Sequence, residues 1–415
     1  MNRAAHHSSP AVAARIRKRY VAERNFRLLG LSAVVFSALV LAFLLVSMTS
    51  AGVNGFRRAE VRFPLDLTAS QFPIDPRLAA QADASAQLEA AGLPTLVSDA
   101  ATDALGADGA AQIDSSAWRE VAEKIADDPS LLGNKIAVSL PVTGDLASGL
   151  RGGDSPAMQA LAARLKREDK LQWAWDPGFL SRSDATDPQA AGIWAALKGS
   201  MLTMLVTLLM AFPIGVLSAV YLEEYAPRNR WTEWIEISIN NLAAVPSIIF
   251  GLLGLAVFLT LFPNYRSAPL IGGMTLALMT MPVIVISARN AIKSVPPSIR
   301  DGALAIGASR IQVVFHHVLP LALPGILTGT IIGMARALGE TAPLLMIGMR
   351  AFVATPPDGF TSPSSVLPVQ IFLWSDEIDR GFVARTSAAI IVLLLFLLVM
   401  NGVAIYLRNR FERRW

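Results

Sequence analysis

Long hydrophobic segments separated by shorter polar stretches are the main pattern along this chain. Six of them can cross the roughly 30 Å hydrocarbon core of a bilayer, which takes about 20 helical residues. The pattern therefore predicts an all-α integral membrane protein with six transmembrane helices. The segments lie near residues 28–50, 197–222, 237–262, 268–288, 321–346 and 386–407.

The first segment has features of both a signal peptide and a membrane anchor. Seven Lys or Arg residues precede it, as in a signal peptide. A cleavable hydrophobic region is usually only about 7–15 residues long, however, and this segment is longer. We therefore expect 28–50 to be retained as the first transmembrane helix.

Basic residues predict how the segments are oriented. The tails 1–27 and 408–415 are both rich in Arg and Lys, and the positive-inside rule places both in the cytoplasm. Two cytoplasmic ends require an even number of spans, which six satisfies. The same rule places the basic loop 289–320 inside. The loop 223–236 gives weaker evidence, because four glutamates accompany its two arginines.

The region 51–192 is predicted to be an extracytoplasmic α+β domain inserted between the first two helices. Its part 55–190 has 13 basic and 20 acidic residues and no histidine. Residues 155–169 favour a helix with Ser155 and Pro156 at its start, and 135–142 favour a strand. The alanine-rich stretch 78–112 is expected to be partly disordered. We interpret the domain as structural or partner-contacting, and removable without loss of translocation.

Composition supports the membrane assignment and excludes several functions. Apolar residues make up 53% of the chain and charged residues 16%, against about a quarter in soluble proteins. The basic residues flank apolar segments and do not alternate with aromatics, which argues against nucleic-acid binding. Cysteine is absent, so disulfides and thiolate metal sites are excluded. The chain has no G-x-x-x-x-G-K-[ST] loop, so it cannot itself be an ATPase.

The loop 289–320 has the signals of two short helices. We expect Ser294 to cap a helix with Pro296 and Pro297 in its first turn, and Gly307 to end it. Ser309 is expected to cap a second short helix that reaches Leu319-Pro320. Neighbouring His316 and His317 face different sides of a helix, which disfavours a metal site.

Charges inside the fifth segment are the strongest functional signal. Arg336 and Glu340 follow 25 residues (311–335) without Asp, Glu, Lys or Arg. Small residues at every fourth position, Gly325, Gly329, Gly333 and Ala337, predict close packing on another helix. At 100° per residue both charges fall on this stripe, so we expect them to face the helix–helix interface.

Two interpretations of the Arg336–Glu340 pair remain open. It can be a self-neutralising structural pair, or it can bind an anion. Guanidinium matches tetrahedral oxyanions in a bidentate way. Phosphate keeps a proton at neutral pH that a carboxylate can accept, whereas sulfate has none. Thr341 can add a hydroxyl donor. Thr203, Thr207 and Ser247 either line a translocation path or are hydroxyls that pack between helices.

The spacing Asp301-Gly302-Ala303, then Gly307, then Leu319-Pro320 resembles the Glu-Ala-Ala loop of ABC importer permeases. Asp replaces the Glu and Gly replaces the first Ala of that pattern. The resemblance implies that Arg300, Asp301, Gly302, Ala303 and Gly307 form a coupling loop that docks on a cytoplasmic ATPase.

Three longer stretches narrow the resemblance. "NNLAAVPSIIFGLLGLAVF" (240–258), "LPLALPGILTGTIIGMARALGETAPLL" (319–345) and "VLPVQIFLW" (366–374) are similar to PstA-type permeases of the phosphate importer. The resemblance implies the ABC importer permease fold, with a five-helix core at 193–407. It implies inward phosphate transport across the bacterial cytoplasmic membrane. Substrate contact is expected from Arg336, Glu340 and Thr341; neither a catalytic residue nor a metal site is expected.

The same resemblance implies the partners. They are a PstC-type second permease chain, two PstB-type ATPases that carry the ATP and Mg, and a PstS-type extracytoplasmic phosphate-binding protein. This chain is expected to bind no cofactor of its own and to contact membrane lipid but no nucleic acid. The alternatives are a permease for another oxyanion or small solute, and a membrane-anchored sensor of external conditions.

Overall fold

The computed structural model describes residues 10–68, 70, 72, 84–153, 155–349, 352–379 and 381–411. They divide into two compact units, residues 1–51 and 52–415. The described part of the first unit lies in helix α1 (Pro10–Val53), which is long and apolar enough to cross a membrane. This helix is longer than the predicted 28–50, because Ala, Arg, Lys and Glu upstream of the apolar segment are themselves good helix formers.

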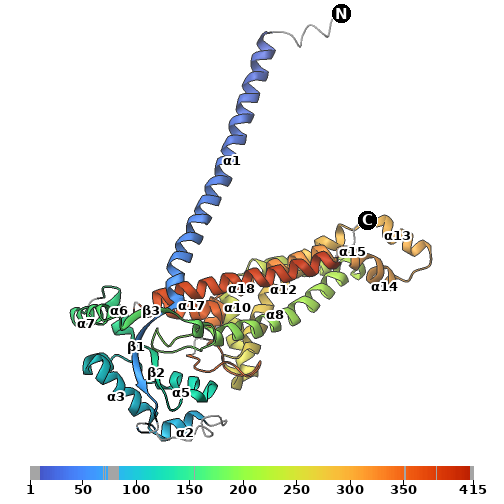
Figure 1. Cartoon of the computed structure of the whole chain (residues 1–415). Helices are drawn as coiled ribbons and strands as arrows, with labels where there is room; N and C mark the ends of the chain where they lie inside the picture. Colours follow the sequence, from blue (N-terminus) through green and yellow to red (C-terminus); the bar gives the residue numbers. More distant parts are fainter. Residues whose placement is uncertain are drawn as a thin grey trace, which may run out of the picture. The chain divides into compact units, whose positions relative to one another are not determined.

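The second unit opens with an antiparallel sheet whose first strand lies in the middle (Figure 1). Strand β1 (Arg57–Asp66) pairs with β2 (Lys135–Pro141) on one side and with β3 (Leu171–Trp175) on the other. Val61 and Phe63 of β1 are buried while Arg62 between them is exposed, as the period-two alternation of a strand requires. The predicted strand at 135–142 is confirmed as β2.

Short helices flank this sheet (Figure 1). The predicted helix at 155–169 is confirmed as α7, whose first turn contains Pro156 and whose Met158 N–H donates to Ser155 Oγ at 3.4 Å. The helices are α2 (Ala84–Ala90), α3 (Leu93–Leu105), α4 (Ala107–Ala110), α5 (Trp118–Asp127), α6 (Gly144–Leu150) and α7 (Pro156–Arg167), with 3₁₀ turns at Asn54–Phe56, Pro129–Leu131 and Pro177–Leu180.

The expectation of disorder in the alanine-rich stretch 78–112 is wrong for residues 84–112. Residues 78–83 lie outside the described part of the chain. In α3, Leu93, Val97 and Leu105 are buried in the core beside the sheet. Their spacing places them on one face of the helix, so a few large side chains anchor a stretch that is otherwise mostly small.

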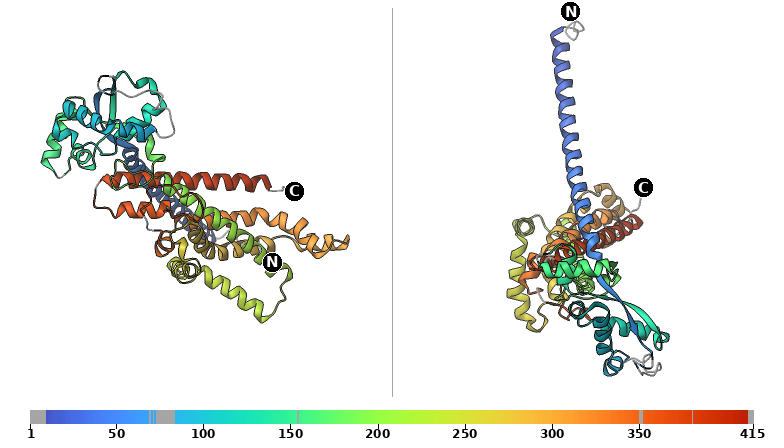
Figure 2. Two further views of the ribbon diagram at one scale, coloured as in Figure 1. Left: turned by 90° about the horizontal axis from the view of Figure 1, so that it is seen from below. Right: turned by 60° about the vertical axis from the view of Figure 1, so that its left-hand side comes forward.

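Long apolar helices form the rest of the second unit. Helices α8, α12, α15 and α18 pack in sequence against one another (Figures 1 and 2). With α1, five helices of the described residues can each cross a membrane, or six spans result if one bent pair counts as a single span. The helices are α8 (Trp194–Val220), α9 (Arg230–Ala243), α10 (Ser247–Leu253), α11 (Leu259–Leu261), α12 (Pro269–Lys293), α13 (Pro297–Ala305), α14 (Arg310–Gln312), α15 (Leu319–Gly339), α16 (Ala342–Met346), α17 (Leu367–Ser375) and α18 (Gly381–Phe411). Wider π-helical turns lie at Tyr221–Tyr225, Gly254–Phe258 and Val313–Val318, and a 3₁₀ turn at Pro263–Tyr265.

The third predicted span, 237–262, is not one straight helix. The chain bends by 104° between α9 and the helices at 247–261. Pro246 lies at the bend with a non-helical ψ of 137°. Proline has no N–H to donate and disfavours helical geometry in the residue before it, so it interrupts a segment whose hydropathy alone looks continuous.

The small-residue stripe of α15 packs closely on α12, as its spacing predicts. A Cβ added to Gly325 would lie 2.7 Å from the Ala291 side chain, and one added to Gly329 would lie 2.1 Å from that of Ser287. Glycine therefore sets how closely these two helices approach.

Replacing Gly329 by leucine should destabilise the helix pair. The new Cβ alone would overlap Ser287, and overpacking of this kind costs about 1–3 kcal/mol or more. Thermal unfolding of the purified protein in detergent measures the loss. Gly402→Leu on α18 is the matched control, because its added Cβ meets no atom of a neighbouring element within 4 Å. Equal melting temperatures for the two variants would contradict this packing.

Candidate functional site

Arg336 and Glu340 lie at the end of α15. Nε of Arg336 is 3.5 Å from Oε1 of Glu340, at the limit of a hydrogen bond. The Arg336 side chain is 51% exposed and that of Glu340 is 21% exposed. At this separation the two side chains are only weakly bound to each other.

The expectation that both charges face the interface between helices is wrong for Arg336. Ala337 is fully buried, and Arg336 lies about 100° away from it around the helix. Residues four apart advance by about 40° around a helix, so the contact stripe has turned by about 120° between Gly325 and Ala337. Arg336 is aligned with the start of that stripe and not with its end.

The fifth predicted segment, 321–346, also ends earlier than expected. Helix α15 stops at Gly339, and Glu340 is its C-terminal capping residue with extended ψ of 109°. Thr341 then precedes the short helix α16 and is half-buried. The charges therefore lie where the chain leaves a helix, and Pro343 just beyond them cannot continue the ladder of α15.

A small, mostly apolar cavity of about 10 Å³ lies beside Ala337, large enough for about one water molecule. Ser200 and Thr203 of α8 contribute its hydroxyls. Thr203 Oγ1 is buried and has no hydrogen-bond partner among the described residues. Thr207 differs, because its hydroxyl donates to the Thr203 carbonyl at 2.9 Å, the bond of a helix-packing hydroxyl.

The predicted coupling loop contains α13, but its start is not where we expected it. Ser294 is the C-terminal capping residue of α12, and α13 begins at Pro297 with Pro296 as its N-cap. Pro297 disfavours helical geometry in the residue before it, and Pro296 accordingly has a non-helical ψ of 137°, so the new helix begins only at Pro297. At the other end, Gly307 adopts φ +89°, a conformation that favours glycine, and ends the helix as predicted.

Ser309 caps the next helix, as predicted, in a capping box with Gln312. The expectation of a separate short helix reaching Leu319-Pro320 is wrong. Helix α14, the π-helical turn after it and α15 follow one another without a break. Pro320 falls in the first turn of α15, where a missing N–H disrupts nothing essential.

Residues of the predicted coupling set point in different directions. Asp301 and Gly302 are exposed, as is the neighbouring Ile306, whose exposed fraction is 82%. Ala303 is buried, and the Arg300 side chain is 22% exposed. Helix α13 therefore presents Asp301, Gly302 and Ile306 outward and holds Arg300 inward.

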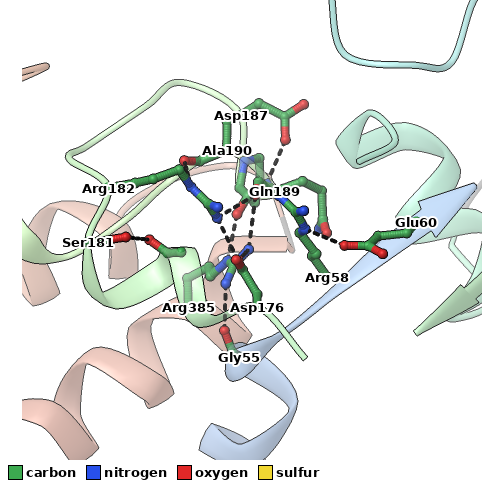
Figure 3. A network of polar contacts seen from close by, with 12 residues as sticks. Gly55, Arg58, Glu60, Asp176, Ser181, Arg182, Asp187, Gln189, Ala190 and Arg385 are labelled. Carbon is green, nitrogen blue, oxygen red and sulfur yellow. Dashed lines mark hydrogen bonds and ion pairs between the residues drawn. The ribbon is translucent and has the colours of Figure 1, made fainter. Parts of the chain in front are cut away.

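A buried charge network is the feature that sequence reasoning missed (Figure 3). Asp176 accepts hydrogen bonds from two arginines at one oxygen, Oδ2: from Arg182 at 2.6 Å and from Arg385 at 2.9 Å. Asp176 and Arg385 are each 2% exposed. Arg385 is in the first turns of α18, and Asp176 directly follows β3, so the network joins the sheet to the last long helix.

Backbone carbonyls complete the surroundings of Arg385. Its guanidinium also donates to the carbonyls of Pro188 at 2.6 Å, Gly55 at 2.7 Å and Gln189 at 3.1 Å. The sequence placed Arg385 just outside the segment 386–407, where a basic residue normally faces solvent. Nothing local to Arg385 distinguishes it from such a flank, because its partners come from residues far away in the chain.

Two aspartates beside this network have perturbed pKa values. Burial raises the pKa of Asp187, although the N–H groups of Gln189 and Gly144 donate to it. Burial likewise raises the pKa of Asp184, which accepts from Trp374 Nε1 at 2.9 Å. Each holds its proton more tightly in the folded state, so each lowers stability as pH rises from its usual pKa to the raised one.

Arg58 extends the charged region along β1. Burial acts to lower the pKa of Arg58, but hydrogen bonds to Glu120 and Glu60 outweigh burial and raise it. Both guanidinium Nη groups donate to the Glu120 carboxylate, at 2.5 and 2.7 Å. Among the described residues, no group of three or more His, Asp or Glu side chains is arranged to hold a metal ion.

Comparison with known families identifies the class of protein. Residues 192–415 match the family described as binding-protein-dependent transport system inner membrane component. Residues 13–160 match a domain of unknown function, DUF3333. Because the first match covers more than half of the chain, this protein belongs to the inner-membrane permeases of binding-protein-dependent transport.

Relatives narrow the assignment. The chain is 34% identical to "Probable ABC transporter permease protein YqgI" of Bacillus subtilis, over 47% of this chain and 66% of that protein. It is 31% identical to the phosphate transport system permease protein PstA of Haemophilus influenzae, over 54% of this chain and 78% of that protein. Identity to PstA 1 of Mycobacterium tuberculosis is 28%, over 54% and 73%. The chain is a PstA-type permease, the non-enzymatic membrane component of an ABC importer whose ATPase is a separate subunit.

A solved structure with a similar arrangement is a chain of the inward-facing MetNI methionine ABC transporter. The alignment covers 53% of this chain and 98% of that one, at 18% identity and a TM-score of 0.44.

Removing the carboxylate of Asp176 should destabilise the protein strongly. Asp176→Ala leaves two arginines without their shared counter-ion in a buried site, and such a loss costs about 3–5 kcal/mol. We expect a lower melting temperature and a lower membrane level, while Asp358→Ala in an exposed loop should leave both unchanged. An Asp176→Ala protein that melts like the control would show that the network is not stabilising.

Proposed function

We propose that this chain is the permease subunit of an ATP-driven importer that moves inorganic phosphate across the cytoplasmic membrane. The observation that carries the proposal is the placement of Arg336 and Glu340. They lie at the end of α15, within the segment matched by the permease family. The side chain of Arg336 is half-exposed and that of Glu340 is partly exposed. Relatives named as phosphate transport permeases support the choice of substrate.

Phosphate suits this pair chemically. The half-exposed guanidinium of Arg336 offers donors to two oxygens of a tetrahedral anion. The Glu340 carboxylate can accept a hydrogen bond from the hydroxyl that phosphate keeps at neutral pH. Thr341 adds a hydroxyl beside Glu340. The pair is only weakly closed on itself at 3.5 Å, so binding an anion does not require breaking a strong ion pair.

The proposed topology has six spans, with the bent pair of α9 and the helices at 247–261 counted as one. Both termini, with the basic tails 1–27 and 408–415, then lie in the cytoplasm. The α/β region within 51–192 lies outside, and the permease core occupies 193–407. The basic flanks of the apolar helices support this orientation.

The proposed assembly contains a PstC-type permease chain, two PstB-type ATPases and a PstS-type binding protein. ATP and Mg belong to the ATPases, and this chain binds no cofactor. The ATPase docks on α13 and the turn after it, where Asp301, Gly302, Ile306 and Gly307 are exposed. Exposed apolar side chains beside an acidic one suit a protein contact better than a water-facing loop.

Arg336→Lys should reduce phosphate uptake by about tenfold or more. Lysine keeps the charge but loses the two-pronged donor geometry, and a charge-assisted hydrogen bond contributes about 1.5–3 kcal/mol. Uptake of labelled phosphate by the assembled importer in vesicles is the measurement. Arg62→Lys, an exposed arginine of β1, is the matched control and should transport normally.

The double variant Arg336→Ala with Glu340→Ala separates binding from structure. It leaves no unpaired charge, so a purely structural pair would tolerate it. Near-normal phosphate uptake by this variant, at normal membrane levels, would refute the anion site. Transport of another oxyanion in place of phosphate would retain the site and refute the substrate.

Ile306→Asp should weaken docking of the ATPase. The side chain is 82% exposed at the end of α13, so the change costs the permease little stability but adds a charge to the proposed contact. Ile378→Asp is the matched control, because Ile378 is 98% exposed in the loop before α18. Co-purification of the ATPase should fall for the first variant only; equal recovery would place the contact elsewhere.

A further inference from the structure

Three acidic and three basic side chains join α9 and α13 to the ends of α8 and α12. None of them belongs to the proposed anion site. Their charges balance, and they come from elements that are separate in the chain. They are Glu223, Glu224, Glu236, Arg289, Lys293 and Arg300.

Arg300 connects α13 to two other helices. Its Nη2 and Nε lie 2.8 and 3.1 Å from Oε1 of Glu224, which is in the π-helical turn at the end of α8. The same guanidinium donates to the carbonyls of Val295 at 2.6 Å and Ile292 at 2.9 Å, at the end of α12. One side chain of α13 thus contacts the ends of both α8 and α12.

Arg289 forms a second connection beside the first. Its Nε donates to Oε1 of Glu223 at 2.5 Å, and its Nη2 lies 2.6 Å from Oε1 of Glu236 on α9. Lys293 lies 3.3 Å from the same oxygen of Glu223. Because Glu223 and Glu224 are adjacent, both connections meet in the π-helical turn that follows α8.

The two faces of α13 have different chemistry. Its outward face has the exposed side chains of Asp301, Leu304 and Ile306. Its inward face has buried Ala303 and the mostly covered Arg300. Arg300 cannot contact an outside partner in this arrangement without giving up its bonds to Glu224 and the two carbonyls.

We infer that Arg300 and Glu224 form the joint through which a displacement of α13 reaches α8, and that Arg300 is a positioning residue and not an ATPase contact. This inference rests on the proposed function, in which the ATPase docks on the outward face of α13. A push on that face passes to the rest of the protein through the inward contacts. Among these contacts, the two hydrogen bonds from Arg300 to Glu224 are directional and charged. Glu224 lies in a π-helical turn, a feature that is frequent at functional sites.

Glu224→Gln tests the joint with little change of shape. We expect the variant to bind the ATPase as wild type does and to continue hydrolysing ATP. Phosphate taken up per ATP hydrolysed should fall about tenfold, because a partly buried charge pair loses its anionic half. Glu233→Gln, on the exposed face of α9, is the matched control and should keep the wild-type ratio.

Arg300→Ala and Ile306→Asp compare the two faces of α13 directly. Arg300→Ala should retain ATPase co-purification while losing coupled uptake, and Ile306→Asp should lose co-purification itself. Loss of the ATPase from Arg300→Ala to the same degree as from Ile306→Asp would make Arg300 a docking contact and overturn the inference. A wild-type uptake ratio in Glu224→Gln would also overturn it.

A second readout separates this inference from the choice of substrate. The chain has no cysteine, so labels can be attached at Leu217→Cys on α8 and Tyr406→Cys on α18, both exposed. In the assembled importer, ATP should change the distance between these labels, and Glu224→Gln should abolish the change. Suppose that the wild-type importer moves no phosphate, but that ATP changes the label distance in it and not in Glu224→Gln. That result would refute the proposed substrate only. A distance change that persists in Glu224→Gln would refute the joint.

Discussion

Charged side chains beside apolar helices must be paired, because taking an ion out of water costs several kcal/mol unless another group replaces the solvent. Arg385 in the first turns of α18 is the clearest case. It is 2% exposed, and it is held by Asp176 and by the carbonyls of Gly55, Pro188 and Gln189. Because Arg385 must be paired, the start of β1, the end of β3 and the loop before α8 all lie around its guanidinium (Figure 3).

The α/β region is therefore built into the permease and is not a module attached by a flexible linker. The four acceptors of Arg385 all lie in 55–190, the region that we expected to be removable. A deletion of that region would leave Arg385 without these partners, so its effect on assembly would have to be separated from any effect on transport. The same rule applies at the other ends of the helices, where Glu223 and Glu224 pair with Arg289 and Arg300.

Sequence patterns predicted the elements whose signals are local. The apolar segments, the cap at Ser309, the stop at Gly307 and the close packing of Gly325 and Gly329 follow from hydropathy, capping chemistry and residue size. The failures came from competition between signals. Pro246 bends a segment that is apolar throughout, and Pro296 prevents Ser294 from starting α13. Arg336 was misplaced because a stripe of residues four apart turns slowly around the helix.

The sequence by itself determined that this is a multi-span membrane protein with an arginine and a glutamate in its fifth apolar segment, and it located the helix cap at Ser309 and the helix stop at Gly307. These features depend on short stretches whose chemistry acts over one or two helical turns. Only the tertiary structure decided that Arg336 is half-exposed, that Arg300 turns inward, and that Arg385 is buried against Asp176. Arg385 has a partner 330 residues away and Arg300 has one 76 residues away, and no local pattern encodes a contact at such separations.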